Sequence, residues 1–83
     1  MTAAPSLTTR RVLVTGADGF LGRGVVAALA REGVSTLVAA DVREVPAERR
    51  LPGVTYLVQD VRDPALAQTL AAHAIDSVVH LAS

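Results

Sequence analysis

The sequence predicts an α/β fold in which helices pack on a doubly wound, parallel β-sheet. Short apolar segments alternate along the chain with segments of helical periodicity, which is the pattern of parallel crossover connections. Of the 83 residues, 51% are apolar, and most of these are Ala, Val and Leu, with one Phe, one Tyr and no Trp. This composition suits helices packed closely on a buried sheet. A chain of this length can build one modest core, so we expect part of one domain.

The first strand and helix follow a short tail. Residues 1–10 are rich in Thr, Ala, Ser and Pro and have no apolar stretch like that of a secretory signal, so we expect a disordered N-terminal tail. Residues 11–15 form a short apolar run that ends at Gly16, which predicts a buried strand. In residues 20–32 apolar positions recur at helical spacing, and Gly33 stands where a left-handed C-terminal cap is expected.

Two further strands are predicted in the middle of the chain. Residues 34–40 and 54–59 are apolar runs, and they end at Asp41 and Asp60. The connection between them mixes charges with Pro and Gly, which indicates irregular structure with one helical turn around residues 47–50.

The last helix and strand complete the predicted order. Asp63 and Pro64 offer an N-cap and a proline at the first helical position, and the helix that follows should share one apolar face as far as Ala74. Residues 76–82 predict a fourth strand. We therefore expect residues 11–83 to form the N-terminal part of a Rossmann domain with strand order 3-2-1-4, truncated after the fourth strand. Its apolar edge predicts weak stability or self-association, such as a homodimer.

Charge and composition exclude several classes of function. Eight acidic and eight basic residues are spread along the chain, so we expect neither a nucleic-acid nor a membrane partner. No cysteine and no long apolar run occur, and we expect a cytoplasmic protein without a bound metal. All eight basic residues are Arg, which excludes a mechanism that needs a lysine amine.

A glycine-rich turn, Thr-Gly-Ala-Asp-Gly-Phe-Leu-Gly, joins the first strand to the first helix. Gly16 would allow the tight turn, Gly19 would let a pyrophosphate approach the backbone, and Gly22 would let the helix pack on the strand. Unpaired N–H groups at the helix N-terminus would hold the phosphates. Glycine triplets also mark ordinary turns, and a methyltransferase-like site remains an alternative, although a Gly-x-Gly-x-Gly turn is expected there. A P-loop is excluded because Arg23, not Lys, follows Gly22.

Two acidic residues follow strands at the same predicted sheet edge. Asp41 stands about 20 residues after the glycine turn, where a carboxylate can accept hydrogen bonds from both hydroxyls of an adenosine ribose. It would repel a 2′-phosphate and so favours NAD over NADP, whereas Arg43 could fold over such a phosphate. The alternative is that Asp41 is a simple turn residue. Asp60 could accept a hydrogen bond from the adenine amino group, and the backbone N–H of Val61 could donate to the ring.

The remaining polar candidates favour structural roles. His80 falls within an apolar strand and is interpreted as a core histidine with its hydrogen bonds satisfied, in preference to a catalytic residue. His73 is expected to be a solvated helix residue, and the two histidines do not form a metal site. Arg62 is expected in solvent, and Tyr56 is expected to pack within the third strand.

Together these motifs resemble the extended short-chain dehydrogenase/reductase superfamily, in its NAD-dependent epimerase/dehydratase branch. The matching positions are residues 15–22, 41, 60–63 and 80–82. The resemblance implies that Phe20 and Leu21 offer backbone N–H groups to the pyrophosphate and that Leu81 and Ala82 line the dinucleotide groove. It also implies that Asp41 holds the ribose and that the residues after the third strand hold adenine. Ser83 stands where the family usually has a second Ala.

The resemblance also implies catalytic parts that this sequence lacks. In the family, a Tyr-x-x-x-Lys pair supplies the acid/base tyrosine and the lysine that lowers its pKa, and a chain without lysine cannot contain that pair. We therefore expect no catalytic residue here. A nucleotide sugar or a related alcohol or carbonyl substrate would be bound by a C-terminal part outside this sequence. A non-catalytic dinucleotide sensor of the same fold is the alternative.

Overall fold

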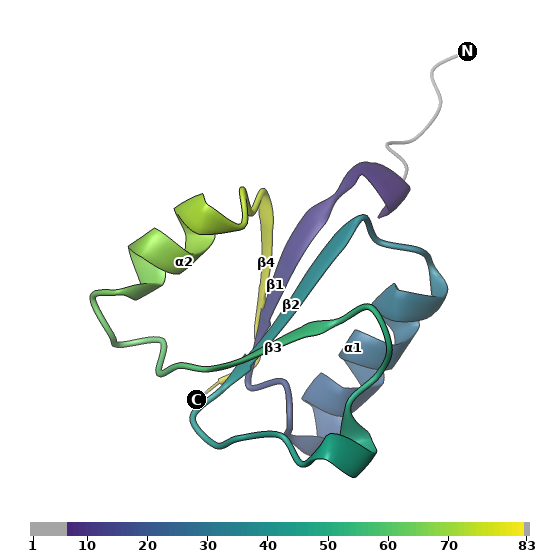
Figure 1. Ribbon diagram of the computed structural model, residues 1–83, viewed down its shortest axis with the longest axis horizontal. Coiled ribbons are helices and arrows are strands. Elements are labelled where there is room, and N and C mark those ends of the chain that lie inside the picture. Colours follow the sequence, from purple (N-terminus) through teal and green to yellow (C-terminus); the bar gives the residue numbers. More distant parts are fainter. Residues whose placement is uncertain (1–6, 83) are drawn as a thin grey trace.

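Four parallel strands form one sheet in the computed structural model, which describes residues 7–82 (Figure 1). The strands are β1 (Arg11–Thr15), β2 (Thr36–Asp41), β3 (Thr55–Val58) and β4 (Ser77–His80). Their spatial order is β3-β2-β1-β4, which confirms the α/β class and the predicted order 3-2-1-4. Because β1 is paired on both sides, Val14 lies opposite Ala39 of β2 and Val79 of β4.

The alternation of side chains along the central strands builds a core on each face of the sheet. On one face, Val12 and Val14 are buried with Val26 of helix α1 (Phe20–Arg31). On the other face, Leu13 and Val38 are buried, and partly buried residues of helix α2 (Leu66–Ala72) pack against them. Figure 1 shows the two helices on opposite sides of the sheet. Both helices cover faces of the sheet, and the C-terminal ends of the strands border a pocket.

The first helix ends as its sequence predicts. The N–H groups of Glu32 and Gly33 donate to the carbonyls of Ala28 and Ala30, at 3.1 Å each. Gly33 adopts a left-handed φ of +74°, which a glycine adopts without steric cost. The expected C-terminal cap is confirmed.

The second helix is shorter than predicted. The Asp63 carboxylate accepts a hydrogen bond from the N–H of Ala65 at 2.9 Å, so it caps the turn that leads into α2, which itself begins at Leu66. Ala74 was expected on the apolar helix face, and this prediction is wrong. Ala74 has a left-handed φ of +51°, and the Ile75 N–H donates past it to the Leu70 carbonyl at 2.9 Å, so Ala74 ends the helix.

The long connection between β2 and β3 contains the predicted helical turn, a 3-10 helix η2 (Ala47–Arg49). A second 3-10 helix, η1 (Leu7–Thr9), lies in the segment that we expected to be a disordered tail. The carbonyl of Arg10 accepts a hydrogen bond from the N–H of Thr36 at 3.4 Å, which ties the end of this segment to β2. Residues 1–6 of the expected tail, and Ser83, lie outside the described residues.

The sheet has two open edges within residues 7–82, at β3 and β4. Val58 on β3 and Val78 on β4 are exposed large apolar residues. The predicted self-association through such an edge remains a prediction. None of the helices in the described part of the chain has the length and apolar character needed to cross a membrane.

Candidate functional site

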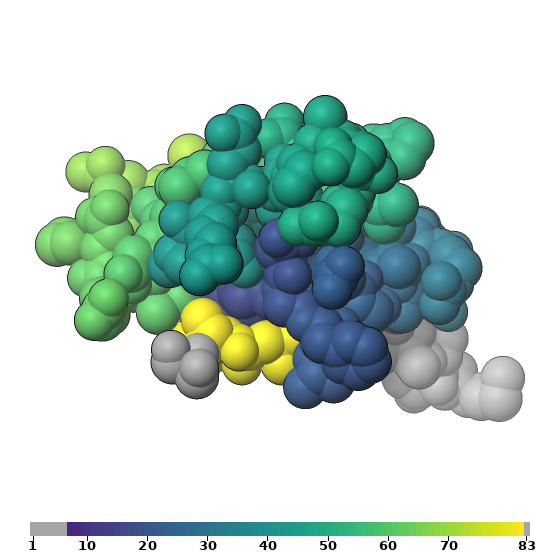
Figure 2. Space-filling view, turned by 90° about the horizontal axis from the view of Figure 1, so that it is seen from below, coloured from purple at the N-terminus to yellow at the C-terminus, as the bar shows by residue number. Residues whose placement is uncertain are grey.

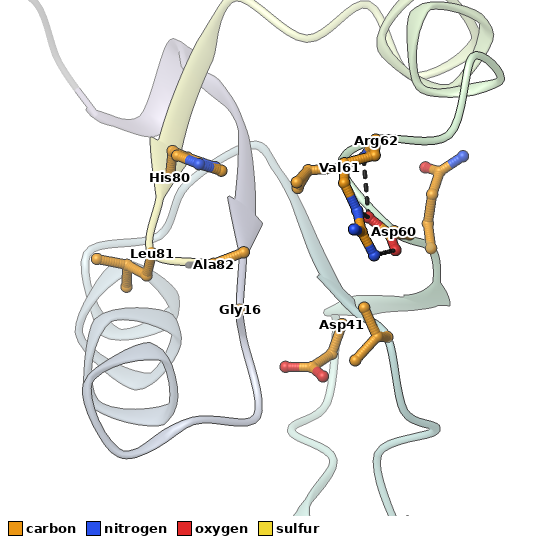
Figure 3. Close-up of a pocket in the computed structure, with 10 residues that line it drawn as sticks. Gly16, Asp41, Asp60, Val61, Arg62, His80, Leu81 and Ala82 are labelled. Atoms are coloured by element: carbon orange, nitrogen blue, oxygen red, sulfur yellow. Dashed lines mark hydrogen bonds and ion pairs between the residues drawn. The ribbon is translucent and has the colours of Figure 1, made fainter.

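A pocket of about 540 Å³ opens at the C-terminal ends of the strands, where parallel α/β sheets bind their ligands (Figure 3). The glycine-rich turn and the segments that follow β2, β3 and β4 all contribute to its wall. Six predicted cofactor residues line it: Gly16, Asp41, Asp60, Val61, Leu81 and Ala82. The other five predicted residues do not line this pocket. They are Gly19, Phe20, Leu21 and Gly22 at the start of α1, and Arg43 after β2.

The glycine-rich turn packs against the end of β4 with no room for a side chain at Gly16. This residue has a φ of +68°, and a Cβ built on it would lie 2.8 Å from the backbone N of Ala82. Figure 2 shows the yellow atoms that follow β4 beside the dark blue atoms of the turn. The close approach joins two parts of the pocket wall that are far apart in sequence.

The N-terminus of α1 presents free backbone donors beside this turn. Gly19 precedes the helix and makes no side-chain cap, and the first N–H groups of an α-helix have no intrahelical acceptor. The Phe20 side chain is 87% exposed and Leu21 is also exposed, so neither covers the helix end. Gly22 is buried, and its Cα lies against the Gly16 carbonyl, so the helix packs closely on the glycine-rich turn, whereas the sequence predicted packing on the strand. This arrangement can bind an anion through the backbone alone.

Asp41 is held at the end of β2 by two backbone donors. One carboxylate oxygen accepts a hydrogen bond from the Asp18 N–H at 2.9 Å, and the other accepts from the Arg43 N–H at 3.2 Å. The hydrogen bond from the Arg43 N–H, two residues later, is typical of an acidic turn residue, which was the alternative interpretation of Asp41. Because a carboxylate has about four acceptor positions, each oxygen keeps capacity for a ligand hydroxyl. Asp41 is thus a positioned acceptor in the pocket wall (Figure 3).

Asp60 and Arg62 form an ion pair across the turn that follows β3 (Figure 3). Oδ1 of Asp60 accepts from the backbone N–H of Arg62 at 2.9 Å and from its Nε at 3.1 Å, and Oδ2 accepts from Nη2 at 2.8 Å. These hydrogen bonds from Arg62 lower the pKa of the Asp60 carboxyl to about 2. The Arg62 side chain is 87% exposed, as expected, but its ion pair with Asp60 was not predicted.

His80 lies at the pocket wall and not in the core, so the predicted core placement is wrong. His80 is exposed, as is Val78 two residues earlier on the same face of the edge strand β4, and it borders the pocket. Its Nδ1 is 2.8 Å from Oγ1 of Thr15, and Thr15 is 2% exposed. The expectation that its ring has a hydrogen-bond partner is met.

The other aromatic candidates have local structural contacts. His73 is half-buried, not fully solvated, and its Nδ1 lies 3.0 Å from the Thr69 carbonyl oxygen. The Tyr56 hydroxyl accepts a hydrogen bond from the Leu51 N–H at 2.8 Å, while its ring packs against the core and lies under Arg50. These contacts agree with the packing role predicted for Tyr56.

An ion pair that was not predicted from the sequence lies beside the glycine-rich turn. Nε and Nη2 of Arg49 donate to the two carboxylate oxygens of Asp18, at 3.0 and 2.6 Å. The partners are 31 residues apart, so neither helical nor strand periodicity could have paired them. The pair lines a second pocket, of about 290 Å³, between α1 and the connection that contains η2.

Comparison with protein families gives a match over residues 12–83 to the NAD dependent epimerase/dehydratase family. A comparison with curated proteins gave no match.

Solved structures with the same fold include several enzymes. A GalE-like L-threonine dehydrogenase from Cupriavidus necator, in its holo form, is 29% identical with a TM-score of 0.75, over 88% of this chain and 23% of that one. UDP-glucose 4-epimerase from Thermotoga maritima, solved with UDP-glucose, is 27% identical with a TM-score of 0.75, over 88% of this chain and 24% of the epimerase. The enzyme WbmF from Bordetella bronchiseptica, in complex with NAD+ and UDP, is 28% identical with a TM-score of 0.75, over 98% of this chain and 25% of WbmF.

The chain thus spans about a quarter of the length of these solved structures. The family match nevertheless covers the four strands except the first residue of β1, both α-helices and all the residues that line the larger pocket. The chain therefore belongs to the NAD-dependent epimerase/dehydratase family, within the extended short-chain dehydrogenases/reductases.

Proposed function

We propose that this chain binds NAD(H) and forms the coenzyme-binding part of an NAD-dependent oxidoreductase, epimerase or dehydratase. The observation that carries the proposal is the position of Asp41, whose carboxylate borders the larger pocket while its oxygen accepts the N–H of Asp18 in the glycine-rich turn. An acidic ribose ligand beside a phosphate-binding helix terminus is the arrangement that dinucleotide binding requires.

The residues present fit a dinucleotide along the sheet edge. A Cβ built on Gly19 would contact only the Gly16 carbonyl, at 3.4 Å, so the turn is open to a phosphate on that side. The pyrophosphate would accept hydrogen bonds from the backbone N–H groups of Phe20 and Leu21. The Asp41 carboxylate would accept hydrogen bonds from the ribose hydroxyls. NAD would supply the hydride acceptor of the reaction.

The adenine end would lie beside β3. Asp60 Oδ2 accepts one hydrogen bond, from Arg62, and keeps a lone pair for the adenine amino group. The Val61 N–H would donate to the ring, and Leu81 and Ala82 would line the groove beside the dinucleotide. We propose NAD as the preferred coenzyme, because Asp41 would repel a 2′-phosphate even with Arg43 nearby.

Isothermal titration of the full chain with NAD+ tests the proposal. Asp41→Ala should weaken NAD+ binding by roughly 10-fold or more, since hydrogen bonds to a charged group contribute about 1.5–3 kcal/mol. Asp76→Ala is the matched control, because Asp76 also accepts a backbone N–H, from Arg11, but at the opposite end of the strands. Binding of S-adenosylmethionine without binding of NAD+ would instead support a methyltransferase-like site, and equal NAD+ affinity in Asp41→Ala would contradict the proposal.

The substrate that we propose is a nucleotide sugar or a related alcohol or carbonyl compound. The support is that one similar structure holds UDP-glucose and another holds UDP, whereas a third is an L-threonine dehydrogenase. UDP-glucose and L-threonine are therefore the two probes to compare in a protein that joins this chain to a C-terminal substrate-binding part. Epimerisation of UDP-glucose is followed by its sugar product, and oxidation of L-threonine by NADH absorbance in the presence of NAD+.

A dinucleotide sensor without catalysis is the second candidate. The 83 residues contain no lysine, so the Tyr-x-x-x-Lys pair of the family cannot be formed from them, and NAD+ binding is the function that they can supply by themselves. A reading frame that continues past Ser83 into a Tyr-x-x-x-Lys pair would support the enzyme, and a stop codon directly after Ser83 would support the sensor.

A further inference from the structure

The Asp18 carboxylate is held in one orientation beside the glycine-rich turn. Its side chain is only 14% exposed, and both of its oxygens are engaged by the Arg49 guanidinium. A two-pronged contact of this kind is geometrically specific and stronger than a single-point ion pair. Arg49 is thereby drawn towards the turn and its charge is compensated.

Asp18 also touches the proposed ribose ligand through its backbone. Its N–H donates to Oδ2 of Asp41 at 2.9 Å, and the N–H of Arg43 donates to Oδ1 at 3.2 Å. Any group attached to a ribose hydroxyl that binds Asp41 must lie close to these two neighbours. A 2′-phosphate would therefore meet the charges of Asp18 and Arg43 as well as that of Asp41.

Arg49 contacts the Asp18 carboxylate, and the charges of Arg23 and Arg43 act on it from a greater distance. Arg49 of η2, Arg23 of α1 and Arg43 after β2 all stabilise its charged form, and together they hold the pKa of the Asp18 carboxyl below its usual value. Asp18 and Asp41 oppose this positive charge. Removing the charge of Asp18 would leave Arg49 without its partner, at a residue whose backbone N–H is bonded to Asp41.

We propose that Asp18 is a second specificity-determining residue, which disfavours NADP by adding a negative charge next to Asp41 and by keeping Arg49 engaged. The inference rests on the proposed function, because it assumes that the ribose binds Asp41. The role proposed for Asp18 differs from that of Asp41. The charge of Asp18 would repel a 2′-phosphate and its carboxylate binds Arg49, and neither effect needs a contact between the Asp18 side chain and NAD+.

The test compares NAD+ and NADP+ affinities of the full chain by isothermal titration. Asp18→Asn keeps the size of the side chain and removes its charge, so the ratio of NADP+ to NAD+ affinity should rise by about 10-fold or more, with NAD+ affinity changed by less than about threefold. In Asp18→Asn most of the rise in the ratio should come from the released Arg49 guanidinium. The double variant Asp18→Asn with Arg49→Gln lacks that group, so its ratio should return most of the way to the native value. Glu48→Gln is the matched control, since it removes an equal charge from the second pocket without removing a hydrogen bond to Arg49.

The outcomes separate the inference from the proposed function. If the ratio of NADP+ to NAD+ affinity is unchanged in Asp18→Asn, including the case in which both affinities fall equally, the inference is overturned. The proposed function would still stand if the native chain binds NAD+. A native chain that binds neither coenzyme would overturn the proposed function and the inference with it. If Asp18→Asn does not fold, Arg49→Gln alone decides: NADP+ affinity should fall or stay at its native level, and a rise would overturn the inference.

Discussion

The α-carbon of Gly22 faces the carbonyl oxygen of Gly16, and a Cβ built on Gly22 would stand 2.1 Å from that oxygen and 2.8 Å from the Cα of Ala17. Both nearby groups are backbone, so neither can rotate away as a side chain would. The first turn of α1 therefore rests directly on the glycine-rich turn. Any displacement of α1 would move the backbone donors that we propose for the pyrophosphate.

Gly22→Ala should therefore destabilise the chain and weaken binding. We expect a loss of about 1–3 kcal/mol in the free energy of unfolding, as for other insertions into packed interiors, together with lower NAD+ affinity. Urea unfolding and isothermal titration would measure the two effects. Gly24→Ala is the control, because it lies on the same helix with nothing within 4 Å of its Cβ, and it should gain up to about 1 kcal/mol. Equal stability of the two variants would contradict the packing argument.

The pair Asp60 and Arg62 predicts a pH dependence in the acid range. Because the pKa of Asp60 falls from 3.8 to about 2 in the folded chain, its contribution to stability is complete above pH 3.8 and is lost as the pH drops through about 2. Carboxyl carbon chemical shifts of Asp60 should titrate with a midpoint near 2. In Arg62→Gln the midpoint should move towards 3.8, and a native midpoint already near 3.8 would show that the ion pair does not persist in solution.

Thr15→Val tests the hydrogen bond that joins the end of β1 to β4. The substitution replaces the Thr15 hydroxyl by a methyl group and so removes the partner of His80 Nδ1, 2.8 Å away. The Leu81 N–H, which donates to this hydroxyl at 3.2 Å, keeps the Thr15 carbonyl oxygen as its acceptor at 3.1 Å. We expect a loss of about 0.5–1.5 kcal/mol in the free energy of unfolding, the usual net contribution of one hydrogen bond. Thr55→Val, at an exposed position of β3, should change stability little. A Thr15→Val variant as stable as the native chain would show that water replaces this bond without cost.

Tyr56→Phe tests the hydrogen bond between the Tyr56 hydroxyl and the Leu51 N–H. The ring would keep its contacts with the core and with Arg50, whereas the Leu51 N–H would lose its acceptor at 2.8 Å. We expect urea unfolding to show a loss of about 1 kcal/mol. An unchanged free energy of unfolding would mean that the Leu51 N–H finds another acceptor in the connection before β3.

Local sequence signals were sufficient for most of the fold. The apolar runs at residues 11–15 and 34–40 identified buried strands, because a strand covered on both faces needs apolar side chains in both directions. Gly33 marked the end of α1, since the left-handed conformation there favours glycine. The same signal was absent at Ala74, an L-residue in the same conformation, and α2 was accordingly predicted too long.

The glycine-rich turn and the acidic residues that follow β2 and β3 could be located from the sequence, because each lies next to an apolar run in the chain. The strand order was predicted from the usual topology of doubly wound sheets, and the structure confirms it. Contacts between side chains that are distant in sequence were not predicted. Asp18 finds Arg49 across 31 residues, and Thr15 finds His80 across 65. Such pairs form when parallel strands bring their C-terminal ends to one edge, and no local pattern encodes them. For the same reason His80, which the apolar character of its strand placed in the core, lies where the sheet opens into the pocket.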